Sequence, residues 1–484
     1  KSLNSGIMIW ALYLFYQKIG TNMSIIDWNN SYDKSDSPDW NQAQLVNWYL
    51  IANKRGKLPL AAFPTPGLTL WSSSAGSVCR GGIKYNSIAY AVIDNKFYEV
   101  NSAGTKTERG TLTTSTGRVK FAKITDQIVM IDGTHGYHYD CITAVFTQIS
   151  DVDFYHTATS ITAMDEYFLF TKPLSATILY SDISNGLSYN ALNIFQKNRV
   201  AENALGVKAI HGQVWVFGET SIEPYFNSGA PFERSQDSVL NIGVSNIDTV
   251  CSSSDSSMYF LAQQSGGGYM IVQAKQDQFG AISENIRDDL KVLTTVSDAF
   301  AYIYKQADHE FYVITFPTDA KTFVYDITTQ SWHERQSYVS GQYTRHISNF
   351  CISCYNKVII GDYQSGNLYT MDTSVYTEAG TAIRRQLVTY PYYSEGKYIT
   401  GHKLEVLFES GVGTSLIDVY FSKDDGHTFT AFSPTRDIGS TYGARTLLYD
   451  RLGMSRSWQF KVVTTTTAKP VMLGAVGDFS VAEW

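Results

Sequence analysis

The sequence has 484 residues, more than the roughly 250–300 over which one hydrophobic core keeps growing, so we expect two or three domains. Charged residues make up only 17% and aromatic residues 14%, a composition that favours β-strands and extensive burial against neighbours. Of the net charge of −7, residues 83–382 carry 20 basic and 31 acidic groups, which excludes a nucleic-acid reader that relies on a basic face. Five scattered cysteines are too few for a disulfide scaffold.

The N-terminal region contains one long apolar run, Ile7 to Tyr16. Ten residues are too short to cross a bilayer, so we expect no membrane span. The length suits a signal-peptide core, but no small-residue cleavage pattern follows the run. Three interpretations of residues 1–22 stay open: an extension upstream of a natural start at Met23, a buried strand, or an anchor to another subunit.

Residues 83–382 contain a repeated pattern of short apolar strands separated by polar turns. Seven copies begin 36 to 51 residues apart, at Ile83, Val119, Ile161, Val207, Val250, Ala299 and Phe350. This spacing, with three or four strands in each unit, is typical of the blades of a β-propeller. A series of β-sandwiches would also give regular short strands, but the repeat favours the propeller.

We therefore expect an all-β protein with about seven propeller blades over 83–382. Residues 1–82 are expected to form an N-terminal extension and entry segment that docks on another domain or subunit. The blade pattern stops at Ile383, and the strands in 383–484 predict a β-sandwich-like platform domain. Ser283 to Leu293 is the one predicted helix, with Ser283 as its N-cap.

One motif raises the possibility of an enzyme. Ser422 to Phe429 fits the Asp-box pattern S-x-D-x-G-x-T-[W/F], in which Gly426 permits the turn and the Asp424 carboxylate accepts backbone N–H groups. Asp-boxes occur in sialidases, where they are structural. A sialidase also needs an arginine triad and a tyrosine nucleophile, and no convincing arginine cluster is present, so a glycosidase is disfavoured.

The remaining candidates for chemistry have ordinary structural interpretations. Cys351 and Cys354 form a single C-x-x-C whose side chains point to opposite faces of a strand. His135 and His138 lie in a glycine-rich turn, and the paired carboxylates, such as Asp288 and Asp289, are adjacent in sequence and would diverge. Glycines 266–268 lack the helix and lysine of a phosphate loop. We predict no catalytic residue, no cofactor and no metal site.

Four blocks of the sequence resemble one protein family. They are Asn47 to Trp71, with N-W-Y and a Pro-Gly turn; Ile178 to Arg234, with W-V-F-G and S-I-E; His309 to Ser337, with V-Y-D and W-H-E-R; and Ser457 to Val481. Together they resemble the packaged-DNA stabilisation proteins, also called tail-hub or nozzle proteins, of short-tailed bacteriophages. Residues 1–46 show no such resemblance.

The resemblance implies a non-enzymatic virion protein that is assembled in the host cytoplasm. It implies a homo-hexameric ring that extends the tail below the portal and its adaptor, retains packaged DNA and guides its ejection. It also implies partners at the tail: fibres or spikes, and tail-tip or needle proteins. Double-stranded DNA would pass without sequence-specific contacts, and an acidic lumen would let it slide.

A second class of function stays open on the residues alone. A propeller could bind a receptor or a carbohydrate, with aromatic residues such as Trp215, Trp332 and Tyr225 as sugar platforms. Burial in the blade core is the competing role for each of these side chains.

Overall fold

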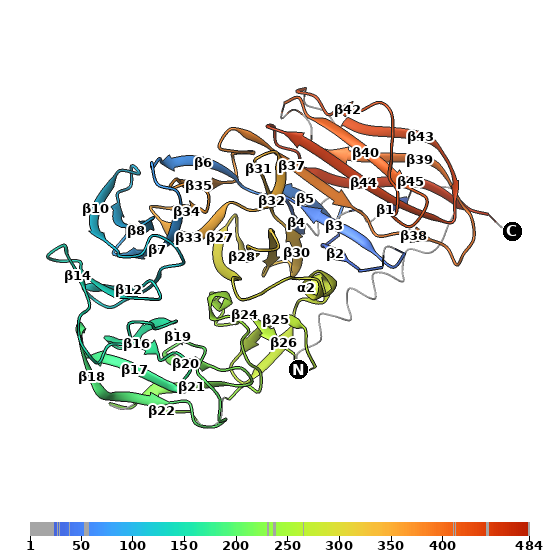
Figure 1. Cartoon of the computed structure of the whole chain (residues 1–484). Helices are drawn as coiled ribbons and strands as arrows, with labels where there is room; N and C mark the ends of the chain where they lie inside the picture. The colour runs from blue at the N-terminus through green and yellow to red at the C-terminus, as the bar shows by residue number, and fades with distance from the viewer. Residues whose placement is uncertain are drawn as a thin grey trace.

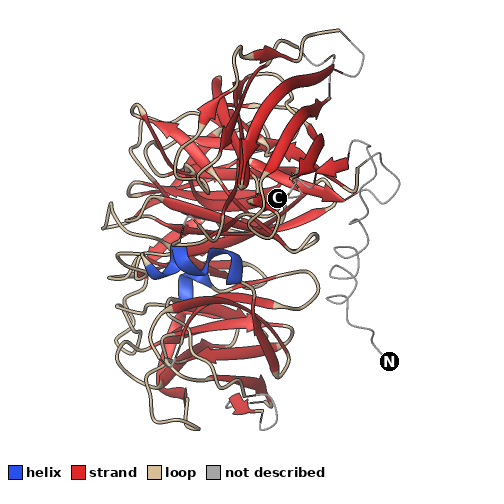
Figure 2. Cartoon of the chain, turned by 90° about the vertical axis from the view of Figure 1, so that its right-hand side faces the viewer, coloured by secondary structure: helices blue, strands red, loops and turns tan. Residues whose placement is uncertain are grey.

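The computed structural model describes most of the chain: residues 24–26, 28, 30–37, 39–52, 58–229, 232–235, 239–264, 266–409, 411, 413–441 and 445–482. Within these ranges, strands form both domains and helix is confined to short segments (Figure 2). The apolar run Ile7 to Tyr16 and Met23 lie outside the described residues, so the interpretations of residues 1–22 stay predictions.

In the described residues, seven units of four antiparallel strands follow one another around a ring (Figure 1). The first five are separate sheets, and the last two belong to one larger sheet. Blades one to three consist of β7 (Cys79–Tyr85), β8 (Ile88–Ile93), β9 (Lys96–Val100) and β10 (Lys106–Thr111); β11 (Lys120–Lys123), β12 (Gln127–Ile131), β13 (Gly136–Asp140) and β14 (Val145–Gln148); and β15 (Ile161–Met164), β16 (Tyr167–Thr171), β17 (Thr177–Asp182) and β18 (Asn185–Gln196).

Blades four to six continue the same order. They consist of β19 (Gly206–Ile210), β20 (Gln213–Phe217), β21 (Ile222–Asn227) and β22 (Phe232–Arg234); β23 (Cys251–Ser252), β24 (Met258–Gln263), β25 (Tyr269–Lys275) and β26 (Gln278–Ala281); and β27 (Phe300–Gln306), β28 (His309–Phe316), β29 (Lys321–Asp326) and β30 (Ser331–Glu334). Each predicted repeat begins at or beside the first strand of a blade, so the seven-bladed fold is confirmed.

The seventh blade closes the ring with a strand from the other end of the chain. It contains β33 (Ser348–Cys354), β34 (Lys357–Asp362), β35 (Leu368–Asp372) and, as its outer strand, β6 (Gly67–Ser72). Because β6 precedes the first blade and pairs with the last, separating the blades would require breaking a sheet. The ring is thereby stabilised as one unit.

Alternating side chains bury both faces of each blade. In β12, Ile128 and Met130 pack in an apolar cluster shared with blade one, whereas Val129 and Ile131 pack in a cluster shared with blade three. Successive residues of a strand point to opposite faces of the sheet, so a blade that packs against a neighbour on each face needs apolar residues at both sets of alternate positions. Apolar clusters of this kind join every pair of adjacent blades.

The second domain is a β-sandwich built from both ends of the chain. One sheet contains β39 (Ile399–Phe408), β43 (Arg445–Ser455), β45 (Met472–Val481), β1 (Ser24–Ile26), β4 (Trp48–Ala52) and β5 (Leu60–Pro64). The other contains β3 (Gln42–Val46), β37 (Thr381–Val388), β44 (Ser457–Thr466), β40 (Leu416–Ser422), β38 (Tyr392–Tyr393), β41 (Thr430–Ala431) and β42 (Arg436–Asp437). Residues 24–72 thus supply strands to both domains.

Short elements connect the two domains and the blades. These are β2 (Asp33–Lys34), β36 (Thr377–Glu378), the hairpin β31 (Gln336–Val339) and β32 (Gln342–Arg345), and the 3-10 turns η1 (Ile247–Thr249) and η2 (Glu284–Ile286). The predicted helix is present as η2 followed by α2 (Arg287–Lys291). Ser283 does not cap it through its side chain, because its hydroxyl accepts the N–H of Ile271 at 2.9 Å.

Candidate functional sites: the domain junction and the axial cavity

The Asp-box is a turn that is held by its own side chains. Asp424 accepts the backbone N–H of Thr428 at 2.9 Å and the hydroxyl of Ser422 at 2.7 Å. Hydrogen bonds from Thr428 and Ser422 lower the pKa of Asp424 to about 2. Gly426 has φ +88°, which glycine adopts without strain. The motif therefore has the structural role that the sequence predicts.

The other candidates for chemistry also lie in structural settings. Cys351 packs on the side facing blade six and Cys354 on the side facing blade one, so the C-x-x-C is split between two cores. His138 is buried and contacts Gln127 at 2.9 Å, and burial lowers its pKa. Asp288 and Asp289 diverge: the first contacts Lys291, whereas the second accepts the Tyr32 hydroxyl. Within the described ranges, no three metal-ligating side chains gather.

The aromatic residues considered as sugar platforms are buried. Exposed fractions are 5% for Trp215, 1% for Trp332 and 2% for Tyr225. A platform for a sugar needs an exposed ring face, whereas these rings fill apolar clusters between blades or against the sandwich. The geometry therefore gives all three a role in the core.

The block from Ile178 to Arg234 contains a buried ion-pair network beside blade four. The Lys197 ammonium lies 2.5 Å from a carboxylate oxygen of Glu202 and 3.0 Å from one of Glu223, and the side chains of Lys197 and Glu223 are fully buried. Lys197 also donates to the hydroxyl of Ser221 at 2.6 Å. The S-I-E motif at 221–223 thus supplies two partners of one buried lysine, which ties the loop after β18 to β21.

The N-W-Y motif joins the two domains. The Asn47 side chain donates to the carbonyls of Gln336 and Arg384 at 2.9 and 2.8 Å, and so connects the propeller side of the junction to the sandwich strand β37. Trp48 is buried in the sandwich core, and Tyr49 packs in the cluster between blades six and seven. Three consecutive residues therefore anchor one strand segment in both domains.

The W-H-E-R motif reaches the same junction from blade six. Trp332 packs in the core shared with the sandwich, and Glu334 pairs with Val46 of β3. Arg335 is 1% exposed and donates at 3.0 Å to the carbonyl of Pro66, in the Pro-Gly turn that leads into β6. Two of the blocks on which the family resemblance rests therefore meet where the propeller joins the sandwich.

Buried charges accompany this junction. The Glu378 carboxylate lies 3.6 Å from a ring nitrogen of His346 and accepts the hydroxyl of Ser337 at 3.0 Å. Burial raises the pKa of Glu378 to about 7 and lowers the pKa of Arg385 to about 9. Both shifts have the same cause, which is the burial of these two groups at the junction.

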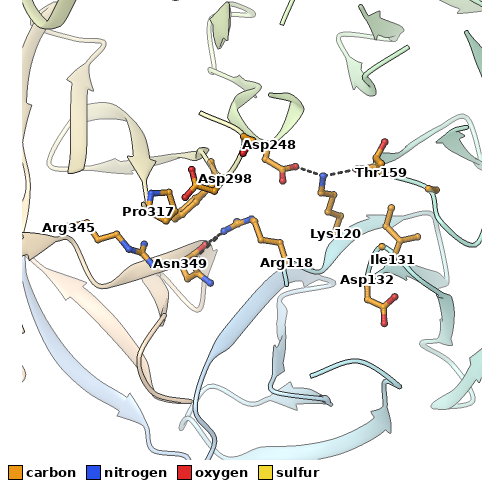
Figure 3. Close-up of a pocket in the computed structure, with 14 residues that line it drawn as sticks. Arg118, Lys120, Ile131, Asp132, Thr159, Asp248, Asp298, Pro317, Arg345 and Asn349 are labelled. Carbon is orange, nitrogen blue, oxygen red and sulfur yellow. Dashed lines mark hydrogen bonds and ion pairs between the residues drawn. The ribbon is translucent and has the colours of Figure 1, made fainter. Parts of the chain in front are cut away.

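The axial cavity lies at one mouth of the propeller ring (Figure 3). Its volume is about 450 Å³, and its walls come from the starts of the innermost strands of several blades. The lining residues used below are Arg118, Lys120, Asp248, Asp298, Phe300 and Arg345. Sequence analysis did not single them out, although each stands within four residues of the first strand of a blade.

Three of the cavity's charged groups already have partners. Lys120 lies 2.5 Å from Asp248 and donates to the carbonyl of Thr159 at 2.6 Å (Figure 3). Asp132, on the same wall, accepts the Thr114 hydroxyl at 2.6 Å and the backbone N–H of His135 at 2.7 Å. The groups left to act on a ligand are therefore the two arginines and Asp298.

Fold and repeat together define the class: the chain is a seven-bladed β-propeller protein with an attached β-sandwich. A family model described as Bacteriophage P22 Gp10, beta-propeller, in the phage stabilisation family, matches residues 30–376. The chain belongs to this family, and it is therefore a structural protein of a bacteriophage. The resemblance stated from the sequence is thereby confirmed.

Solved structures with a similar arrangement of strands are distant in sequence. The extracellular domain of a putative hybrid two-component system from B. thetaiotaomicron matches at 11% identity and TM-score 0.44, over 76% of this chain and 47% of that one. BamB from Moraxella catarrhalis matches at 9% identity and TM-score 0.38, over 72% and 99%. This chain spans about half the length of the first of these proteins.

A search of curated protein sequences finds no match. Across the described residues, no helix has the length and apolar character needed to span a bilayer.

Proposed function

We propose that this chain is the tail hub, or nozzle, of a short-tailed bacteriophage. In this role six copies form a ring below the portal and its adaptor, extend the channel for DNA, help to retain the packaged genome and guide its ejection. The observation that carries the proposal is the family match over residues 30–376. The protein acts without catalysis or a cofactor, in the virion tail, after assembly in the host cytoplasm.

The construction of the chain supports a load-bearing role. A ring closed by β6 and a junction fixed by Asn47, Trp48 and Tyr49 make one stiff body out of two domains. A protein that retains DNA under pressure must keep its shape when force is applied across its domains. A loosely linked pair of domains would yield at the linker instead.

Exposed apolar residues support assembly into a ring. Val152, Leu174 and Leu192, in or beside blades two and three, have exposed fractions of 93%, 92% and 84%. Large apolar side chains at such exposure favour contact with a neighbouring subunit, which would remove them from water. Fibres or spikes and tail-tip or needle proteins are the other partners that we propose for the outer surfaces.

The excess of acidic groups in 83–382 supports passage of DNA without tight binding. A lumen lined by acidic side chains would repel phosphates within a screening length of roughly 8 Å and let the duplex slide. The proposal requires that these groups face the lumen of the assembled ring. A ring structure with a basic lumen would contradict the sliding argument.

The decisive experiment mixes the purified full chain with a purified portal–adaptor complex and images the product by electron microscopy. The proposal predicts a six-fold ring attached below the adaptor. A chain that stays monomeric and is not recruited by the complex would exclude the hub role. Glycan-array binding by the isolated chain would instead favour the receptor-binding alternative, which the burial of Trp215, Trp332 and Tyr225 does not support.

A further inference from the structure

The axial cavity contains two arginines that have no carboxylate partner. Arg118 donates to the backbone carbonyl and the side-chain oxygen of Asn349 at 3.0 and 3.3 Å. Arg345 is 6% exposed, and within the described residues its guanidinium makes one hydrogen bond, a long one of 3.5 Å to the carbonyl of Ser348. In the described part of the chain, neither guanidinium has a carboxylate oxygen within 4.0 Å.

Aromatic rings hold both guanidinium groups in place. The Arg118 guanidinium carbon lies 4.0 Å from the centre of the Phe300 ring, and that of Arg345 lies 5.8 Å from the same centre. Arg345 also stacks at 3.6 Å on Tyr363. A stacked guanidinium is fixed in orientation and still directs its N–H groups outward, so the side chain loses little conformational entropy when it binds an acceptor.

The electrostatics of the site favour the entry of one negative charge. Burial lowers the pKa of Arg345 to about 10 and also lowers that of Arg118. Asp298 supplies partial compensation: one of its oxygens accepts two hydrogen bonds from Thr318, and the other is buried without a partner among the described residues. The three cations of the whole lining equal its three carboxylates in number, so an anion would be attracted by the two guanidinium groups that lack a carboxylate contact and not by a net charge.

The geometry points to a carboxylate-binding site at the axial mouth of the propeller, formed by Arg118 and Arg345, whose guanidinium groups both lie near the Phe300 ring. A carboxylate matches the flat fork of a guanidinium and can accept two parallel hydrogen bonds from it. A doubly charged phosphate fits less well, because Asp298 and Asp248 would repel the second charge. The cavity has the size of a small-molecule pocket, at about 450 Å³, and cannot admit a duplex.

The carboxylate can come from a free small molecule or from an acidic side chain of another polypeptide. Two probes separate these sources: N-acetylglycine, which is a free monocarboxylate, and the blocked peptide acetyl-Gly-Glu-Gly-amide, whose glutamine analogue is its control. Binding of each probe to the purified full chain is measured by saturation-transfer NMR. We expect at least one carboxylate probe to bind with a Kd of about 1 mM or tighter and the glutamine peptide not to bind.

Variants locate the binding. Arg345→Gln and Arg118→Gln should each weaken the probe that binds by about tenfold or more, because each removes one charge-assisted pair. Arg456→Gln is the matched control, since Arg456 is an exposed arginine of the sandwich that lies 4.9 Å from the Tyr398 ring. Circular dichroism checks folding, and the half-buried Arg118 provides the test if the Arg345 variant does not fold.

Each outcome decides the proposal. Binding of either carboxylate probe that is lost in Arg118→Gln and kept in Arg456→Gln supports the site, and the preferred probe identifies the source. Absence of binding by both probes, equal binding by the Arg118→Gln variant, or tighter binding of inorganic phosphate would overturn it. This inference does not depend on the proposed tail-hub role, because it is tested on the isolated chain.

Discussion

The buried lysine of blade four provides a quantitative test of how this fold is stabilised. Replacing Lys197 by Met removes the cation that contacts the carboxylates of both Glu202 and Glu223, and leaves Glu223 with Arg234 at 3.9 Å. At an effective dielectric constant of about 20, unit charges about 3 Å apart interact by about 5 kcal/mol. Breaking a buried pair by removing one partner typically costs about 3–5 kcal/mol. We therefore expect Lys197→Met to lower the free energy of unfolding by about 3–5 kcal/mol.

Chemical denaturation of the purified chain, followed by circular dichroism and by hydrogen exchange of the amides of β21, measures this change. The matched control is Lys96→Met, because Lys96 lies 2.6 Å from Glu108 but both side chains are more than one third exposed. Exposed pairs contribute about 0–1 kcal/mol. If Lys197→Met destabilised the chain no more than Lys96→Met does, the network would not be the stabilising element that its burial indicates.

Three further predictions address ring closure, the junction and the thiols. Gly67→Ala should destabilise blade seven by about 1–3 kcal/mol, because the added Cβ would lie 2.5 Å from the carbonyl oxygen of Val375. Gly280→Ala is the control, because the space around Gly280 is open, and it should change the stability by less than about 0.5 kcal/mol. Hydrogen exchange of β35 measures both variants, and equal effects would contradict the reasoning. Burial raises the pKa of the Glu378 carboxyl to about 7 in the native chain. The unfolded chain therefore releases this proton at a lower pH than the native chain does. As a result, the free energy of unfolding falls as the pH rises towards about 7. The free energy of unfolding of Glu378→Gln, relative to that of the parent, should therefore be higher at pH 8 than at pH 5 by up to about 3 kcal/mol. A difference between variant and parent that does not change with pH would contradict this prediction. Burial raises the pKa of Cys79 and Cys251 to about 12, so iodoacetamide at pH 8 should modify them more than about tenfold faster in the unfolded chain than in the native one; equal rates would contradict the burial.

The blades were predictable because their signal is local. In each repeat, short strands carry apolar side chains and end at turn residues such as Asp94, so the pattern is visible without knowing any partner strand. The Asp-box was predictable for the same reason: its donors and acceptors lie within seven residues of one another.

The long-range pairings were not predictable from these patterns. Strand β6 pairs with β35, about 300 residues later in the chain, and β3 pairs with β37 at a similar distance. The residues of β6 do not specify the strand with which it pairs, since the backbone groups of any free sheet edge could accept it. The same limit applies to Ser283, whose position suggests a helix cap but whose hydroxyl bonds to a strand.

The axial cavity illustrates a third limit. Arg118 and Arg345 are 227 residues apart in the sequence and become neighbours of Phe300 only when the ring closes. Both residues stand just before the first strand of a blade, and this position can be recognised from the sequence repeat. The position predicts a shared site only once the number of blades and the direction of the inner strands are known.

The most direct test of the proposed tail-hub role is the place of this chain in the particle from which it comes. An antibody against the purified chain, applied to intact particles and viewed by electron microscopy, should label the tail between the portal vertex and the tail tip, with the symmetry of a six-fold ring. Particles that carry no label, or label only on the capsid shell, would contradict the account.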